Sequence, residues 1–83
     1  MKVKNIPDKM LGDFWGMNFY ADKELRHPLK TKPDVVYVAA SLKGRARRRV
    51  VAHEKIEAHL MRDGGLNYAD AHKVAEKMDK MVR

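Results

Sequence analysis

The feature that most constrains the fold is a long stretch without proline or glycine, from Ala46 to Arg62, which ends at Asp63-Gly64-Gly65. Its apolar side chains recur at helical spacing, which predicts an amphipathic helix over 46–62. Glycine suits the left-handed conformation that often follows a helix end, so the glycine pair marks a turn. Asn67 is then placed to cap a second helix that runs to about Met81. The sequence therefore predicts a C-terminal helical hairpin.

One segment before the hairpin is typical of a β-strand. Residues 34–40 are rich in β-branched side chains and are bounded by Pro33 and by a turn at Ser41. Residues 1–34 hold most of the aromatic side chains but show no sustained periodicity. We expect them to wrap the core as an irregular segment, with a short helix or turn near 21–26 and, as an open alternative, a strand near 17–20.

These elements predict a single small α+β domain over residues 1–83. Its core, residues 35–83, has the order strand, helix, turn, helix, and one clear strand or a small antiparallel sheet packs on the hairpin. With 83 residues the chain has room for one small core.

The absence of cysteine limits the chemistry of the chain. It excludes disulfides and thiolate ligands, so a metal ion would need His, Asp or Glu ligands. No apolar run is long enough to span a membrane, and the N-terminus lacks the apolar core of a signal peptide. We therefore expect a soluble, cytoplasmic protein that makes no contact with a membrane. The sequence leaves its oligomeric state open.

The positive charge is concentrated in one segment. The net charge is +7, yet residues 50–83 are balanced and the excess lies mainly in residues 43–49. Cations at a helix start oppose the helix dipole, so an anionic partner such as nucleic-acid phosphate would explain them. The alternative is a solvated helix start. The candidate residues for nucleic-acid or anion binding are Lys43, Arg45, Arg47, Arg48 and Arg49.

The middle of the first helix holds a polar pair in an apolar setting. At about 100° per residue, His53 and Glu57 fall within the apolar face, Glu54 falls beside it, and His59 points away. A buried, unpaired carboxylate is costly, so Glu57 needs a neutralising partner. A metal ion, a histidine or Arg49, which projects beside His53, would each serve.

An antiparallel hairpin about the glycine turn places His72 across from Glu57 and Glu76 across from His53. His53, Glu57 and His72 would then form a three-ligand metal site with an open position for water, and Glu54 could take a proton from that water. The alternative is a charge-assisted hydrogen bond between His72 and Glu57 with no metal. The H-E-x-x-E pattern alone is a weak signal, because it arises often by chance in charged helices.

Two stretches of the chain resemble known small proteins. The strand residues 36–38 followed by Arg47-Arg48-Arg49-Val50-Val51-Ala52-His53-Glu54 resemble the strand and active helix of small zincins of the ImmA/IrrE type. The segment from Glu57 to Ala75 is similar to short phage, plasmid and archaeal-virus proteins with H-E-x-x-E, a glycine turn and Y-x-x-A-H-x-x-A. The similarity covers about residues 35–78.

The resemblance implies a zinc-dependent metallopeptidase. His53 matches the first zinc ligand of those proteins and Glu54 matches the general base. Glu57 stands where their second histidine lies, and His72 would complete the ligand set. Because of this departure, two interpretations stay open: an active peptidase, or a catalytically degenerate scaffold kept for binding.

Three classes of function follow from the sequence. The first is a metal-dependent hydrolase acting on a protein or peptide substrate. The second is a basic nucleic-acid-binding or regulatory module that uses residues 43–49. The third is an interaction protein that presents its N-terminal aromatic side chains, although core packing is the commoner fate of such side chains.

Overall fold

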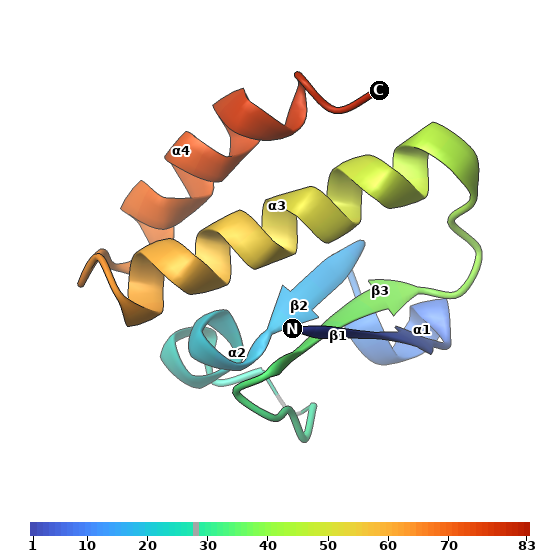
Figure 1. The fold of residues 1–83 in the computed structure, drawn as a ribbon. Helices are drawn as coiled ribbons and strands as arrows, with labels where there is room; N and C mark the ends of the chain where they lie inside the picture. The colour runs from blue at the N-terminus through green and yellow to red at the C-terminus, as the bar shows by residue number, and fades with distance from the viewer. Residues whose placement is uncertain (28) are drawn as a thin grey trace.

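Three strands form one mixed sheet in the computed structural model, which describes residues 1–27 and 29–83 (Figure 1). The strands are β1 (Lys2–Ile6), β2 (Gly16–Asn18) and β3 (Val35–Ala39), and their order is β1-β3-β2. β3 lies in the centre, where it pairs parallel with β1 and antiparallel with β2. The predicted α+β class is confirmed, but the sheet is mixed rather than antiparallel.

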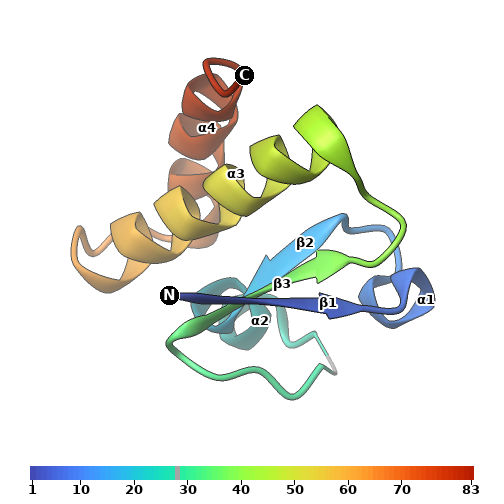
Figure 2. The ribbon, with the colours of Figure 1, turned by 45° about the vertical axis from the view of Figure 1, so that its right-hand side comes forward.

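The described residues form four helices: α1 (Asp8–Leu11), α2 (Phe19–Leu25), α3 (Gly44–Arg62) and α4 (Tyr68–Asp79). The first three contact the sheet directly. α3 crosses one face of the sheet, and α4 packs against α3 (Figures 1 and 2). The predicted helical hairpin is therefore confirmed. The side chain of Asn67 caps α4 as expected, because its Oδ1 accepts the backbone N–H of Asp70 at 2.9 Å.

The predicted strand over 34–40 is also confirmed, and it is buried on both faces. Side chains alternate along a strand, so Val36 and Val38 point to one face while Tyr37 and Ala39 point to the other. All four are at most 4% exposed. Asn18 pairs with Val36 in the register with β2, so its side chain lies on the same face of the sheet as Val36. This register sets the position of Asn18 beneath α3.

The N-terminal segment has more regular structure than the sequence predicted. The expectation of an irregular wrapping segment over 1–34 is corrected by β1, α1, β2 and α2, which lie in it. β1 was missed because Lys2, Lys4 and Asn5 are poor strand formers, and its main-chain bonds depend on a distant partner, β3. The helix expected near 21–26 is present as α2, and the strand near 17–20 is present as β2, displaced toward Gly16.

No helix among the described residues is long and apolar enough to cross a membrane.

Candidate metal centre

The centre of α3 carries two buried carboxylates. Glu54 is 6% exposed and Glu57 is 1% exposed, although both can carry a negative charge. His53 lies one turn before Glu57 on the same face, and its side chain is 12% exposed. The face predicted for His53 and Glu57 is therefore the buried one. Carboxylates in such a place must have partners, because an unpaired buried charge is strongly destabilising.

α4 brings a second histidine to the same point. Nδ1 of His72 lies 3.1 Å from Oε2 of Glu57 and 3.2 Å from Nε2 of His53. The same His53 nitrogen lies 3.0 Å from the same Glu57 oxygen. The three atoms thus form a nearly equilateral triangle, built from one turn of α3 and the facing turn of α4.

The dimensions of the triangle fit a metal ion of ordinary size. Ligand atoms bound at 2.0–2.1 Å in a tetrahedron lie about 3.3 Å apart, which is within a few tenths of an ångström of the observed edges. Two imidazole nitrogens and one carboxylate oxygen are a donor set that zinc accepts, with the fourth position left open. These residues can therefore hold a divalent ion without rearrangement of the helices.

Hydrogen bonds alone satisfy this arrangement poorly. Both histidines approach the one oxygen of Glu57, so their own nitrogens face each other at 3.2 Å. Each of those nitrogens holds either a proton or a lone pair. A cation at the centre would accept a lone pair from all three atoms at once. Protons on the nitrogens, in contrast, cannot form hydrogen bonds along all three edges of the triangle.

Behind the triangle, Asp79 orients His53. Its Oδ2 lies 2.8 Å from Nδ1 of His53, and its Oδ1 accepts a hydrogen bond from Nη2 of Arg49 at 3.2 Å. This bond leaves a lone pair on Nε2 of neutral His53, directed at the triangle. The sequence left three possible partners for Arg49: Glu57, a substrate or an anionic ligand. In the structure Arg49 pairs with Asp79 instead.

Asp79 was not foreseen, and the prediction that Glu76 faces His53 is wrong. Asp79 lies seven residues after His72, and seven residues return to within about 20° of the same helix face. Glu76, four residues after His72, is rotated further toward solvent and is exposed. The seven-residue spacing between His72 and Asp79 is thus the sequence signal that places Asp79 on the same face of α4.

Asn18 is a second contact that the sequence did not reveal. Its Nδ2 donates to Oε1 of Glu54 at 2.9 Å and to Oε1 of Glu57 at 3.0 Å. It comes from the end of β2, far from α3 in the sequence. Only the pairing of β2 with β3 brings it beneath the helix.

Electrostatics at the centre favour bound protons in the absence of a cation. Burial raises the pKa of Glu54, and the charge of Glu57 raises it further, to about 8. Burial acts to lower the pKa of His53, but the hydrogen bonds to Glu57 and Asp79 and the nearby carboxylate charges outweigh it and raise that pKa to about 9. At neutral pH the metal-free site therefore holds protons that a metal ion would displace.

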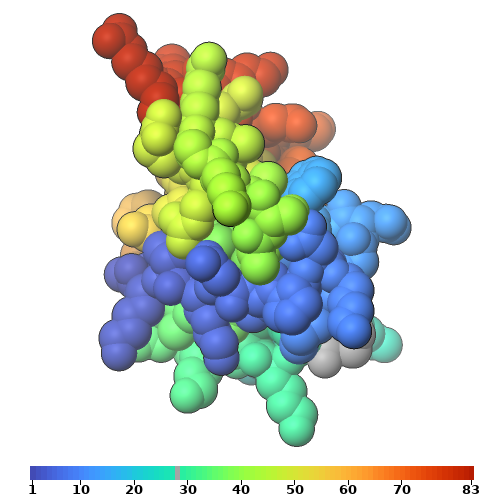
Figure 3. Space-filling view, turned by 90° about the vertical axis from the view of Figure 1, so that its right-hand side faces the viewer, coloured from blue at the N-terminus to red at the C-terminus, as the bar shows by residue number. Residues whose placement is uncertain are grey.

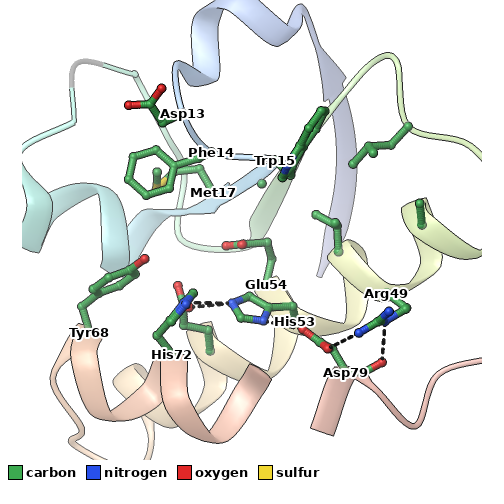
Figure 4. Close-up of a pocket in the computed structure, with 15 residues that line it drawn as sticks. Asp13, Phe14, Trp15, Met17, Arg49, His53, Glu54, Tyr68, His72 and Asp79 are labelled. Atoms are coloured by element: carbon green, nitrogen blue, oxygen red, sulfur yellow. Dashed lines mark hydrogen bonds and ion pairs between the residues drawn. The ribbon is translucent and has the colours of Figure 1, made fainter. Parts of the chain in front are cut away.

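A cavity of about 550 Å³ opens beside the triangle (Figure 4). The carboxylate of Glu54 points into it, and Phe14, Trp15 and Met17 lie across from the histidines. Trp15 is 57% exposed, so this part of the aromatic segment lines the cavity instead of filling the core. β2 approaches α3 closely here: a Cβ at Gly16 would lie 2.7 Å from Cγ1 of Val50 and 2.8 Å from Cγ of Glu54.

The remaining candidates lie away from the triangle. His59 points away from the triangle, as its helix position predicted; it is exposed and pairs with Asp63. The basic residues surround the start of α3, which stands out beside β1 and α1 (Figure 3). Arg47 donates to the side chain of Asn5, and Arg48 donates to the backbone carbonyl of Arg83. Lys43, Arg45, Arg47 and Arg48 thus lie in the cap and first turns of α3, with Arg47 directed at β1 and Arg48 at the C-terminus, while Arg49 pairs with Asp79 beside the triangle.

No protein-family model, curated protein or solved structure matches this chain. Its function is therefore inferred from its own side chains.

Proposed function

We propose that the protein is a small zinc-dependent hydrolase that cleaves peptide bonds. His53, Glu57 and His72 would hold the zinc ion, and Glu54 would act as general base. One observation supports this most strongly: three ligand atoms from two helices meet in a triangle with edges of 3.0–3.2 Å. Beside the triangle lie a cavity and the oxygen of Glu54 that Asn18 does not contact. A purely structural ion pair would need neither of them.

The position of Glu54 supports the role of base. The ion itself would polarise a carbonyl group and lower the pKa of a coordinated water. Glu54 is held through Oε1 by Asn18, so its second oxygen is left to accept the proton of the attacking water and deliver it to the leaving nitrogen. The positive charge of the ion would counter the effect of burial on the pKa of Glu54, so that the carboxylate form becomes available near neutral pH.

The cavity walls support a peptide as substrate. Phe14, Trp15 and Val50 give it apolar surface, while Asp13 and Glu54 would repel a phosphate group. Arg49 also reaches the cavity, but its charge is engaged by Asp79. Among the described residues β2 has a strand neighbour on one side only, and its Gly16 and Met17 line the cavity. An extended peptide bound in the cavity would therefore lie beside this strand.

The activity is tested with zinc-loaded protein and a pool of fluorogenic peptides. We expect slow hydrolysis that Glu54→Gln lowers by at least about a hundredfold, because that variant keeps the ligands and loses the base. Zinc affinity of Glu54→Gln should stay near that of the wild type. If zinc binds and no peptide is cleaved, the hydrolase is refuted and a binding scaffold remains.

A second candidate function, binding of nucleic-acid phosphate, is favoured by the start of α3. Its first turn holds no acidic residue, and Lys43 at the cap position makes no side-chain capping bond. Affinity for duplex DNA should then fall steeply with salt, and Arg45→Gln with Arg48→Gln should lower the salt slope. The matched control removes the same charge from exposed positions of α4, with Lys73→Gln and Lys77→Gln. If both double variants lose the same affinity for DNA, the start of α3 is not a specific site and only nonspecific attraction between the protein and DNA remains.

A further inference from the structure

Asn18 connects three parts of the molecule through one side chain. It is the last residue of β2 and the N-cap of α2, where its Oδ1 accepts the backbone N–H of Ala21 at 2.9 Å. Its Nδ2 donates one hydrogen bond to Glu54 and one to Glu57. The side chain is 1% exposed, and its acceptor and both of its donors are used. Because Oδ1 must face the N–H of Ala21, the NH₂ group must face the two carboxylates.

The two bonds fix which carboxylate oxygens are free. Asn18 occupies Oε1 of Glu57, so only Oε2 is directed at His53 and His72. It likewise occupies Oε1 of Glu54, whose carboxylate points into the cavity (Figure 4). Glu57 is therefore restricted to one coordinating oxygen, and Glu54 is held back from the ligand triangle.

A carboxamide suits this place better than a charged donor would. Lysine or arginine could also bridge two carboxylates, but its positive charge would compete with a bound cation. Two adjacent carboxylates without a shared donor would repel each other and would be free to rotate. The amide of Asn18 orients both and leaves their negative charge for the metal ion.

We propose that Asn18 is a positioning residue, which keeps Glu57 as a one-oxygen ligand and Glu54 as a separate base. The proposal rests on the metal centre described above. It predicts a change in coordination, and not only in stability, when the amide is lost.

The test is Asn18→Ser, which keeps an acceptor for the cap of α2 but offers only one donor for two carboxylates. The control is Asn67→Ser, because Asn67 makes the same capping bond, also at 2.9 Å, at the start of α4 and contacts neither carboxylate. Asn18→Asp is the second variant, since it keeps the volume and the cap but has no NH₂ group.

The measurements are the visible spectrum of the cobalt-substituted protein, zinc affinity by chelator competition, and kcat and KM with peptide. For Asn18→Ser and Asn18→Asp we expect an altered cobalt spectrum, as Glu57 becomes free to bind through both oxygens. Asn18→Ser should also lose zinc affinity by roughly 10–100-fold, with kcat reduced more than KM is changed. Asn67→Ser should match the wild type in spectrum and affinity.

The outcomes separate this inference from the proposed function. A wild-type protein that binds neither cobalt nor zinc refutes the metal centre itself. A wild type that binds metal, next to a folded Asn18 variant of unchanged spectrum, affinity and kcat, refutes the role of Asn18 alone. A loss of stability without a change in the cobalt spectrum would show that Asn18 is a structural cap only. One folded Asn18 variant, either Asn18→Ser or Asn18→Asp, is enough to distinguish these outcomes.

Discussion

At the scale of single residues, the centre depends on how His53 is held. Asp79 contacts its Nδ1 and so leaves Nε2 for the ligand triangle. Residues that orient a ligating histidine usually matter for affinity, although they do not touch the ion. A substitution of Asp79 should therefore test the metal centre as directly as a substitution of one of its ligands.

We predict that Asp79→Ala lowers zinc affinity by roughly 10–100-fold, because His53 loses the partner that fixes its ring. Chelator competition measures the change. Glu76→Gln is the matched control, since Glu76 lies on the same helix, carries the same charge and is exposed. If both variants bind zinc like the wild type, Asp79 does not orient the ligand.

Gly16 allows β2 to approach α3. We predict that Gly16→Ala lowers the free energy of unfolding by about 1–3 kcal/mol, because its Cβ would overlap Cγ1 of Val50 and Cγ of Glu54. Urea denaturation measures the loss. The double variant Gly16→Ala/Val50→Ala should recover part of it, since one of the two overlapping groups is gone. A purely additive double variant would argue against this close contact.

At the scale of elements, periodicity and end signals were enough for the hairpin and for β3. The Gly64-Gly65 turn and the cap at Asn67 are local signals, and the buried strand needs no partner to be recognised. β1 has no such signal, and β2 has only a weak one, so a strand near 17–20 was an open alternative. Each is polar or very short, and each exists because β3 supplies its main-chain partners.

The start of α3 offers a prediction of its own. Arg45 is exposed in the first turn, where a cation opposes the helix dipole. Arg45→Glu should therefore raise the free energy of unfolding by about 0.5 kcal/mol at low salt. Lys55→Glu, in the middle of the same helix, should bring no comparable gain. If Arg45→Glu is destabilising instead, the basic side chain contributes to the fold itself.

At the scale of the whole molecule, the candidate site was only half visible in the sequence. His53, Glu54, Glu57 and His72 follow from helix geometry, because helix faces and a short turn determine which side chains meet. Asn18 and the cavity could not be foreseen, since they depend on where the sheet lies under α3. The aromatic side chain of Trp15 was assigned more readily to the core than to a cavity wall.

Stability should depend on pH in a direction fixed by the centre. Folding raises the pKa of Glu54 from 4.5 to about 8 and that of His53 from 6.5 to about 9 in the metal-free protein. The folded chain then binds these protons more tightly than the unfolded chain. The stability that these two protons contribute is full below the pKa values of the unfolded chain. It is lost as the pH rises through the pKa values of the folded chain.

We therefore predict that metal-free protein loses a few kcal/mol of unfolding free energy from about pH 6 to about pH 9. Zinc should stabilise more as the pH rises, because it no longer has to displace protons. Urea denaturation across this range, with and without zinc, measures both effects. Stability that is constant or increases with pH in the metal-free protein would contradict the assigned protonation.

The central claim is that His53, Glu57 and His72 bind a metal ion, and a zinc titration of chelator-treated protein tests it most directly. We predict one zinc ion per chain and, at free zinc about one hundred times Kd, a stabilisation of about 2.7 kcal/mol. For a domain of this size that is a rise in Tm on the order of 10 °C. His72→Ala should abolish the rise, and His59→Ala, which changes the exposed histidine of α3, should retain it. A wild-type protein that binds no zinc and keeps its Tm would contradict the claim.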